Sequence, residues 1–466
     1  MKITLFGAGK GDVTGSAYLV ESGQSKVLID FGLFQGVPNA DGKNRVSERY
    51  TFRNLDAVLL THAHLDHTGR LPILAQRNFS GPIYCTEATK ELAALILRDA
   101  ARIQESDNER LNRRLKREGK PPAKPLYTPE DVEKISKRFQ NVDYDKIISV
   151  APGIEARWTE SGHLLGSASI QLTVNEGGHK KTVVFSGDLG QRSTPLTRSA
   201  GTIEMADAVF LESTYGDRDH RSFKETAAEF TEVVKRASEQ GGKILLPTFA
   251  IGRAQLLVVL LAYLFRKKEV KPFPIYLDSP MAIEASKVYL NHPELWHDRL
   301  KEIVRDRPLR EELAATQSKV CVTGAQSRAL NDVKGTCMIL AGAGMCNAGR
   351  ILHHLRNNVW KPETSVLIVG YQGRNTVGRA LVDGAKDVRI LGERIAVKAS
   401  VHTMGGFSAH AGQKDLLDWL APMVSSRPRV FLTHGEDRGQ RALAACIESR
   451  YKIKAQMPGY HDAIEL

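Results

Sequence analysis

Three histidines and one aspartate lie within six positions of the sequence, in a Thr-His-Ala-His-Leu-Asp-His segment that begins at Thr61. His62 and His64 are two residues apart, so in an extended segment their imidazoles point the same way and can share one metal ion. Asp66 and His67 follow at the start of an expected helix, from where they can reach a second ion. The spacing therefore predicts a site for two metal ions. The alternative is a histidine-rich turn that binds no metal.

The elements around this segment are predicted from the apolar pattern. Residues 57–60 are typical of a buried strand, and residues 65–76 are expected to form one helix. Other short apolar runs that end in a polar residue lie at 27–29, 183–185, 208–211 and 430–432. We expect these strands to be covered by helices on both faces and to end at a common rim, as in layered α/β proteins. Their polar neighbours would then form one site.

Two metal sites need a bridging carboxylate and further imidazoles, because an imidazole nitrogen binds one ion whereas a carboxylate has two oxygens. Asp188, in Phe-Ser-Gly-Asp, is the candidate bridge. His163 and His434 each lie beside small residues that let the backbone come close. Taken singly, either histidine is typical of a hydrogen-bonded structural residue. Their shared context favours metal ligation.

Composition sets broad limits. The chain has 466 residues, which favours two domains or one elaborated domain. Its formal net charge of +12 fits a long polyanion as partner, although many basic proteins have no such role. The five cysteines are scattered without Cys-x-x-Cys pairs, which argues against a disulfide framework or a structural zinc knuckle. Long apolar runs and a signal-peptide pattern are lacking, so we expect a cytoplasmic protein that does not bind membranes.

Two regions differ from the strand-and-rim pattern. Between about 215 and 388, helical stretches alternate with strand-like runs, which predicts an inserted α/β domain. Glu212 lies just before this region and His410 follows it. Residues 98–124 carry nine Lys or Arg against five Asp or Glu and end in a proline-rich turn. A helix with a solvated charged face is favoured there over a dedicated polyanion contact.

The ordered motifs resemble a known family. Asp30, the His62 to His67 segment, His163 and Asp188 resemble the metallo-β-lactamase fold. The three further motifs of the β-CASP nucleases are similar to Glu212, His410 in Gly-Gly-Phe-Ser-Ala-His-Ala-Gly, and His434. Residues 247–255 and 274–282 resemble the β-CASP domain of bacterial endoribonucleases and of the nuclease subunit of the pre-mRNA cleavage and polyadenylation complex. The resemblance spans nearly the whole chain.

The resemblance implies an α/β fold, namely an αββα metallo-β-lactamase sandwich with an inserted α/β β-CASP domain. The sandwich would comprise residues 1–205 and 393–466, and the β-CASP domain residues 206–392. It also implies two Zn²⁺ per chain. One ion would be held by His62, His64 and His163, and the other by Asp66, His67 and His434, with Asp188 as the bridge.

The implied reaction is phosphodiester hydrolysis by a hydroxide that bridges both ions, which leaves 5′-phosphate and 3′-hydroxyl ends. The catalytic set is Asp66, Asp30, Glu212 and His410. Asp30 and Glu212 are expected to be supporting carboxylates, with Glu212 orienting the ring of His434. His410 is expected to protonate the departing 3′-oxygen.

The implied substrate is single-stranded RNA, because the third β-CASP motif is His434, whereas the DNA-repair branch typically carries valine there. Candidate substrate contacts are Arg253, Arg350, Arg374, Arg379 and Ser408; each arginine follows a glycine in the insertion and could equally be a surface charge. Three alternatives stay open, which are a small-molecule thioester or lactone hydrolase, a DNA nuclease of the β-CASP group, and a non-catalytic scaffold. A homodimer is compatible with the sequence.

Overall fold

The computed structural model describes residues 1–45, 52, 54–192, 194–303, 318–370, 372–373 and 375–466. Contacts divide the chain into two compact units. The first unit comprises residues 1–192, 199–219 and 410–466, and the second comprises residues 193–198 and 220–409. The larger part of the second unit, residues 220–409, overlaps the inserted domain predicted at 206–392, whose boundaries stay a prediction.

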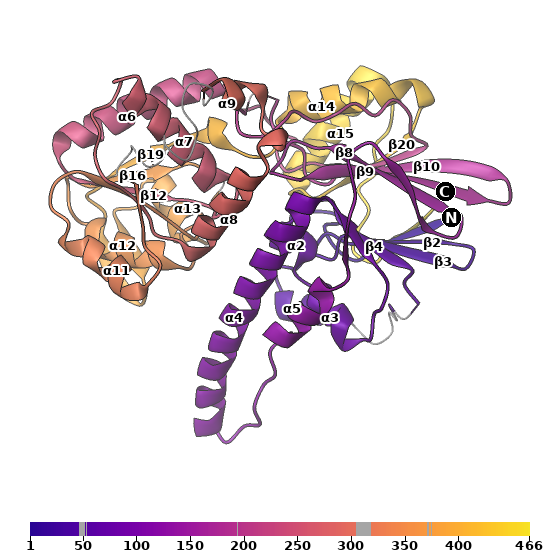
Figure 1. The fold of residues 1–466 in the computed structure, drawn as a ribbon, viewed down its shortest axis with the longest axis horizontal. Helices are drawn as coiled ribbons and strands as arrows, with labels where there is room; N and C mark the ends of the chain where they lie inside the picture. Colours follow the sequence, from indigo (N-terminus) through magenta and orange to yellow (C-terminus); the bar gives the residue numbers. More distant parts are fainter. Residues whose placement is uncertain (46–51, 53, 193, 304–317, 371, 374) are drawn as a thin grey trace. The chain divides into compact units, whose positions relative to one another are not determined.

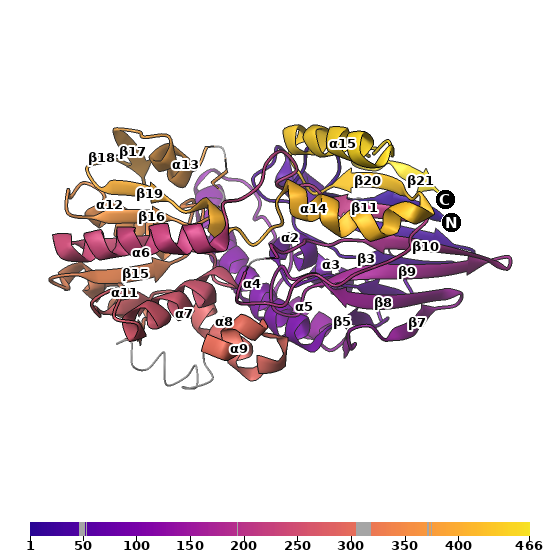
Figure 2. The same cartoon turned by 90° about the horizontal axis from the view of Figure 1, so that it is seen from above.

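The first unit contains two sheets that face each other (Figures 1 and 2). In spatial order, one sheet has β21 (Ala463–Glu465), β1 (Lys2–Leu5), β2 (Tyr18–Ser22), β3 (Ser25–Ile29), β4 (Ala57–Leu59), β5 (Ile83–Cys85) and β6 (Phe139–Asn141). The other has β20 (Arg429–Thr433), β11 (Ala208–Glu212), β10 (His179–Phe185), β9 (Ala168–Glu176), β8 (Ile154–Glu160) and β7 (Ile147–Ala151).

Successive side chains along the strands of the second sheet point alternately into two different hydrophobic cores. Phe185, Phe210 and Phe431 belong to the core between the sheets. Their neighbours Val184 and Val209 point the other way, into a core shared with helices. The prediction of helices on both faces is therefore wrong for these strands. The apolar runs 183–185, 208–211 and 430–432 are buried because one face packs on a sheet and the other on helices.

The helices of the first unit cover the outer sides of its sheets (Figure 2). They are α1 (Ala40–Asn44), α2 (Leu65–Thr68), α3 (Leu71–Gln76), α4 (Glu87–Arg117), α5 (Pro129–Ser136), α14 (Gln413–Leu420), the 3₁₀ helix η4 (Ala421–Ser426) and α15 (Asp437–Tyr451). Leu416 of α14 and Leu443 of α15 are fully buried against the second sheet. Burial of such leucines contributes roughly 1.5–3 kcal/mol each.

The single helix predicted at 65–76 is in fact two helices, α2 and α3. Pro72 lies in the first turn of α3, where its missing N–H costs nothing, but it could not continue a helix from α2. Arg70, between the helices, is buried and donates hydrogen bonds to the carbonyls of Phe6, Gly15 and Gly32. The break therefore lets one guanidinium join three backbone segments.

The second unit is built on a parallel sheet. In spatial order its strands are β14 (Ser318–Val320), β13 (Ile275–Leu277), β15 (Cys337–Ala341), β12 (Lys243–Pro247), β16 (Ser365–Ile368) and β19 (Ser400–Thr403). A separate hairpin-like pair consists of β17 (Asp387–Ile390) and β18 (Glu393–Ala396). An α/β insertion was predicted for this part of the chain, and the observed elements are of that class.

The helices of the second unit lie on both sides of its sheet (Figure 2). They are α6 (Phe223–Gln240), α7 (Arg253–Arg266), α8 (Pro280–Asn291), η1 (Pro293–Leu295), α9 (Asp298–Ile303), α11 (Gly324–Ala329), η2 (Leu330–Asp332), α12 (Arg350–Asn358), α13 (Val377–Val382) and η3 (Gly405–Phe407). A capping box of Ser222 and Glu225 starts α6, and Gly241 in a left-handed conformation ends it. Among the described helices, none is both long and apolar enough to cross a membrane.

A buried carboxylate, Asp278, joins three parts of the second unit. It accepts hydrogen bonds of 2.6 Å from Ser327 Oγ, Arg350 and His354 Nε2. Burial opposes its ionisation, but these donors outweigh burial and lower the pKa of Asp278. Its stabilising contribution is therefore complete at neutral pH and is lost as the pH falls through this lowered pKa.

Replacement of Asp278 with alanine should destabilise the second unit by about 3–5 kcal/mol, because it leaves buried donors unpaired. Urea unfolding at pH 7, followed by circular dichroism, measures the change. Lys287→Gln is the matched control, since it breaks an exposed ion pair with Glu284 in the same unit and should change stability little. Equal midpoints for the two variants would contradict a structural role for Asp278.

Candidate metal centre

The carboxyl ends of parallel strands bring the predicted ligands together within the first unit. Strands β3 and β4 are parallel neighbours in one sheet, and β10, β11 and β20 are parallel neighbours in the other. Parallel strands end at the same edge. The residues that end or follow these strands are Asp30, His62, Asp188, Glu212 and His434. His163 comes from the loop between β8 and β9.

The first group of potential ligands consists of His62, His64, His163 and Asp188, whose ligand atoms lie within 4.8 Å of one another. His64 Nδ1 is 3.2 Å from His62 Nε2 and 3.1 Å from His163 Nε2. A tetrahedral zinc with bonds of about 2.0–2.1 Å separates its donor atoms by roughly 3.3 Å. These three nitrogens therefore have the spacing of one metal's ligands.

The second group consists of Asp66, His67 and His434. His434 Nε2 is 3.3 Å from both His67 Nε2 and Asp66 Oδ2. A carboxylate and two imidazoles form a donor set suited to zinc or a similar divalent ion. The spacing and chemistry of this group also fit a metal.

Asp188 lies between the two groups and faces each with a different oxygen. Its Oδ2 is 3.4 Å from His62 Nε2 and 3.6 Å from His163 Nε2. Its Oδ1 is 3.4 Å from His67 Nε2 and 3.4 Å from His434 Nδ1. The side chain is 1% exposed, so water does not compensate its charge. This is the arrangement that a carboxylate shared by two cations requires.

The electrostatics of the first group keep its ligands in the state that binds metal. Burial lowers the pKa of His62 and His163, and it lowers the pKa of His64 to about 4. These rings are therefore neutral at pH 7 and present a lone pair. Burial opposes ionisation of Asp188, but nearby His434 and His67 outweigh burial and lower its pKa.

The electrostatics of the second group favour positive charge. Burial disfavours protonation of His67, but Asp188 and Asp30 outweigh it and raise the pKa of this ring. Burial likewise opposes a charge on His434, whose pKa is raised by Asp188 and Asp66. The carboxylates thus create a potential that attracts a proton or, in competition with it, a metal cation.

Asp30 supports the cluster without belonging to either ligand group. It accepts hydrogen bonds from the Thr61 amide at 2.8 Å and the Thr61 hydroxyl at 2.7 Å, and its Oδ2 is 2.7 Å from His67 Nδ1. This contact with Nδ1 orients the His67 ring so that its Nε2 points toward His434. Asp30 and His434 both have positive φ, at 55° and 49°, a conformation that non-glycine residues adopt rarely.

His410 and Glu212 form a pair at the edge of the cluster. His410 Nδ1 is 3.3 Å from Glu212 Oε1 and 3.9 Å from Asp188 Oδ2. Glu212 is buried, and it accepts hydrogen bonds from the amides of Leu189 and Thr214. Its oxygens are thus committed to the protein, although Asp188, Glu212 and His410 also lie close enough for a metal.

The structure corrects the partner expected for Glu212. The carboxylate orients His410, whereas His434 Nδ1 lies 3.2 Å from the hydroxyl of Thr214. Burial opposes protonation of His410, but Glu212 outweighs burial and raises the pKa of His410. The pairing follows from the segment after Asp188: the Leu189 amide donates to Glu212, and the Leu189 carbonyl accepts a hydrogen bond from the amide of Ala411, the neighbour of His410.

Two glycines allow the segments of the centre to approach each other closely. A Cβ on Gly32 would lie 1.5 Å from the carbonyl oxygen of Asp66, and one on Gly190 would lie 1.9 Å from the carbonyl oxygen of Gly162. Gly190 also forms a β-bridge with His410. Any side chain at Gly190 would therefore push the His163 loop away from the segment after Asp188.

Sequence reasoning missed two hydroxyl residues, Thr61 and Thr214, that hold site side chains in place. Thr61 immediately precedes His62, and Thr214 lies two residues after Glu212, so position next to a motif was the available signal. Their function depends on contacts with Asp30 and His434, which are distant in sequence.

The candidate substrate contacts lie in the second unit, except that Arg374 is outside the described residues. Arg350 is committed to Asp278 and to the carbonyls of Cys321 and Val322, which argues against the predicted phosphate contact. Arg379 is half-exposed and pairs with Asp383 over one helical turn. Arg253 and Ser408 are buried, each 8% exposed.

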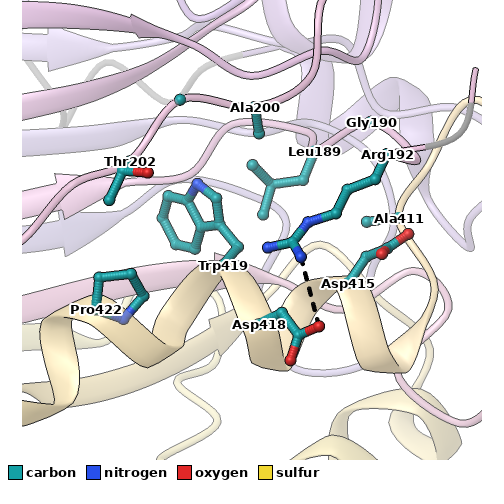
Figure 3. A pocket seen from close by; sticks show the side chains of 11 residues that line it. Leu189, Gly190, Arg192, Ala200, Thr202, Ala411, Asp415, Asp418, Trp419 and Pro422 are labelled. Carbon is teal, nitrogen blue, oxygen red and sulfur yellow. Dashed lines mark ion pairs between the residues drawn. The ribbon is translucent and has the colours of Figure 1, made fainter. Parts of the chain in front are cut away.

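A pocket of the first unit lies between the segment after Asp188 and helix α14 (Figure 3). Leu189, Gly190 and Ala411 form one wall, and Trp419 lies against it. Arg192 pairs with Asp418 of α14 at 3.5 Å across this pocket. None of the potential metal ligands lines this pocket; it contacts the centre only through Leu189 and Ala411, the chain neighbours of Asp188 and His410.

Three family models match the chain in succession. They are the metallo-beta-lactamase superfamily at residues 11–226, the Beta-Casp domain at 254–381 and the Zn-dependent metallo-hydrolase RNA specificity domain at 394–458. The last match includes His410 and His434. The three matches confirm the fold class expected from the sequence.

Whole-chain similarity agrees with these matches. The chain is 38% identical to Ribonuclease TTHA0252 of Thermus thermophilus, over 97% of this chain and 96% of the relative. It is 31% identical to the transcription termination factor FttA of Pyrococcus horikoshii, over 100% of this chain and 71% of the relative. A protein of unknown function from Enterococcus faecalis V583 has a similar fold, with a TM-score of 0.55 and 13% identity over 100% of this chain and 99% of that chain.

The fold and the histidine-rich centre thus define a metal-dependent hydrolase of the metallo-β-lactamase superfamily. Within that superfamily, the chain belongs to the β-CASP family.

Loss of His64 should weaken metal binding, because two of the short nitrogen to nitrogen distances in the first group involve this ring. We expect His64→Ala to lower the affinity for at least one Zn²⁺ by more than about 100-fold, because loss of a residue that only supports a ligand already costs about 10–100-fold. Elemental analysis and zinc titration measure it. His179→Ala, at the exposed start of β10, is the control; wild-type zinc content in His64→Ala would refute the ligand assignment.

Proposed function

We propose that this protein is a zinc-dependent endoribonuclease that cuts single-stranded RNA and holds two Zn²⁺ per chain. The proposal rests on the position of Asp188. One of its oxygens faces the first ligand group, the other faces the second, and the His410 and Glu212 pair lies beside it. The match to an RNA specificity domain and the 38% identical ribonuclease favour RNA as the substrate. A small-molecule hydrolase with the same ligands would not need the His410 and Glu212 pair.

The two ligand groups divide the metals between them. His62, His64 and His163 would hold one ion, and Asp66, His67 and His434 the other, with Asp188 shared. Zinc in these positions would supply an acidified water molecule and positive charge for the phosphate. Asp66 is the more exposed of the two carboxylates among these ligands, at 22% for its side chain. It is therefore the group placed to accept a proton from the attacking water.

His410 supplies the proton that the leaving group needs. Glu212 holds Nδ1 of His410, so the ring presents the Nε2 proton to the substrate. As water bonds to phosphorus, the bond from phosphorus to the 3′-oxygen breaks, and this oxygen takes the Nε2 proton. The phosphate stays on the downstream fragment. The products therefore carry 5′-phosphate and 3′-hydroxyl ends.

We also propose substrate contacts, a cellular location and an oligomeric state for the enzyme. Arg379, Arg253, Arg374 and Ser408 remain our candidates for substrate contacts. We place the enzyme in the cytoplasm, where its five free cysteines would stay reduced. A homodimer remains a prediction, which light scattering of the purified protein measures.

The first test compares labelled single-stranded RNA with DNA of the same sequence, each incubated with zinc-loaded protein. We expect internal RNA fragments with 5′-phosphate ends, no comparable cutting of DNA, and loss of cleavage on chelation. Sequencing gels that resolve product length and end chemistry give the readout. Equal cutting of DNA would show that the enzyme is not specific for RNA. Release of mononucleotides alone would show that it is an exonuclease.

His410→Ala tests the proton donor. It should lower kcat on RNA by about 10²–10⁴-fold while zinc content stays at the wild-type level, because general acid catalysis is lost but no ligand is removed. Glu212→Gln should lower kcat less, since the ring remains. His179→Ala serves again as the control histidine. Unchanged kcat in His410→Ala would exclude the proton-donor role, and loss of zinc would instead make His410 a ligand.

A further inference from the structure

Helix α4 (Glu87–Arg117) is the longest described helix, and its second half stands away from the sheets of the first unit (Figure 1). It begins at Thr86, whose hydroxyl, like that of Thr89, donates a hydrogen bond to the carbonyl of Gly166. Gly166 lies in the same loop as His163. The helix is therefore anchored at the metal centre, and its rise of about 1.5 Å per residue carries Arg110 to Arg117 some 35–45 Å away from its start.

The far half of α4 carries a concentrated positive charge. Residues 110–124 contain seven Lys or Arg and one acidic residue, Glu118. Arg110, Arg113, Arg114 and Arg117 are spaced i, i+3, i+4 and i+7, so they share one face of the helix. All four are exposed. We call this face the arginine stripe.

The opposite side of the helix is held by the returning chain. Asn112 exchanges two hydrogen bonds with the backbone of Ala123, at 3.0 Å and 2.8 Å, and the Lys120 amide donates to the Leu115 carbonyl. The proline-rich segment that follows α4 therefore packs against one side and keeps the helix end ordered. The arginine stripe stays on the side that faces solvent.

Electrostatic repulsion between its guanidinium groups makes the arginine stripe unfavourable when no anionic partner is bound. Arginines three and four residues apart on a helix repel each other. Arg114 has an ion pair with Glu118 at 3.6 Å, and Arg110 has one with Asp107 at 3.6 Å. Both acidic partners are themselves exposed, so these pairs are weak. An anionic ligand that spans the stripe would relieve the repulsion.

We propose that the arginine stripe binds the phosphate backbone of the RNA substrate at a distance from the metal centre; the inference rests on the proposed ribonuclease function. Among the exposed large apolar side chains of the described residues, only Ile103 lies on α4. Protein interfaces centre on apolar and aromatic anchors, which this face lacks. Guanidinium groups without such anchors suit a chain of phosphates read without sequence preference.

The geometry sets the length of RNA that can use the stripe. At about 3.4 Å per nucleotide for a stacked strand, a span of 35–45 Å corresponds to roughly ten nucleotides or more. Long RNA can therefore reach the metal centre and the stripe together, whereas a hexanucleotide cannot. The stripe should raise the affinity for long RNA and leave the chemical step unchanged.

The test is the quadruple variant Arg110→Gln, Arg113→Gln, Arg114→Gln, Arg117→Gln, in which glutamine preserves helix propensity. Its control removes four exposed lysines of the same unit, through Lys180→Gln, Lys181→Gln, Lys452→Gln and Lys454→Gln. Fluorescence anisotropy in EDTA measures binding of a 5′-labelled 40-nucleotide RNA without cleavage. With zinc, kcat/KM is measured on this RNA, on a hexanucleotide and on bis(p-nitrophenyl) phosphate.

We expect the quadruple variant to bind the long RNA at least tenfold more weakly than the control. The slope of log affinity against log salt should fall by up to about 3, since each phosphate contact on a single strand contributes about 0.7. Activity on the two short substrates should stay within about twofold of the control. Long-RNA binding equal to the control would overturn the stripe, and so would an equal loss on all substrates, which shows misfolding or a general defect.

These outcomes separate the stripe from the ribonuclease proposal. If wild-type protein cuts no RNA at all, the proposed function fails whatever the variant does. If wild-type protein cuts RNA and the quadruple variant matches the control in anisotropy and in kcat/KM on long RNA, only the stripe fails.

Discussion

The two halves of the candidate centre are joined through one buried carboxylate. Asp188 has almost no exposure to water, and each of its oxygens faces a different set of imidazoles. A buried carboxylate needs compensating positive charge, and two cations placed on either side provide it with least distortion. The strands, the glycine contacts and the supporting hydroxyls can all be understood as ways to keep both oxygens of Asp188 within reach of their partners. The centre is thus one electrostatic unit and not two adjacent sites.

The architecture explains how residues far apart in sequence reach this carboxylate. Parallel strands in two facing sheets end at one edge, and each contributes a residue there at little extra conformational cost. Further specificity comes from the chain segments after the strands. Gly190 packs on Gly162 and pairs with His410, which brings the His163 loop, Asp188 and His410 into one layer. The positions of the ligands and of the proposed proton donor are therefore set by the same backbone contacts.

Much of the fold and of the centre could be predicted because the signals are local. The His-x-His-x-Asp-His spacing, the apolar runs that precede Asp30, Asp188 and His434, and the helical pattern at 223–240 are all readable in short windows. The errors involve contacts between distant segments. The contact of Glu212 with His410, in place of His434, leaves no periodic pattern in the sequence, and neither does the contact of Arg350 with Asp278. Each depends on how segments distant in the sequence pack together.

The origin of His434 has a consequence for protein synthesis. This residue follows β20, more than 360 positions after His67, which it faces at 3.3 Å. The second group of potential ligands is therefore incomplete until residue 434 has left the ribosome. A nascent polypeptide that has folded strands β1 to β6 holds His62, His64, Asp66 and His67 but lacks His434. A growing chain that lacks His434 would lack one of the proposed ligands, so the proposed ribonuclease activity would require translation past residue 434.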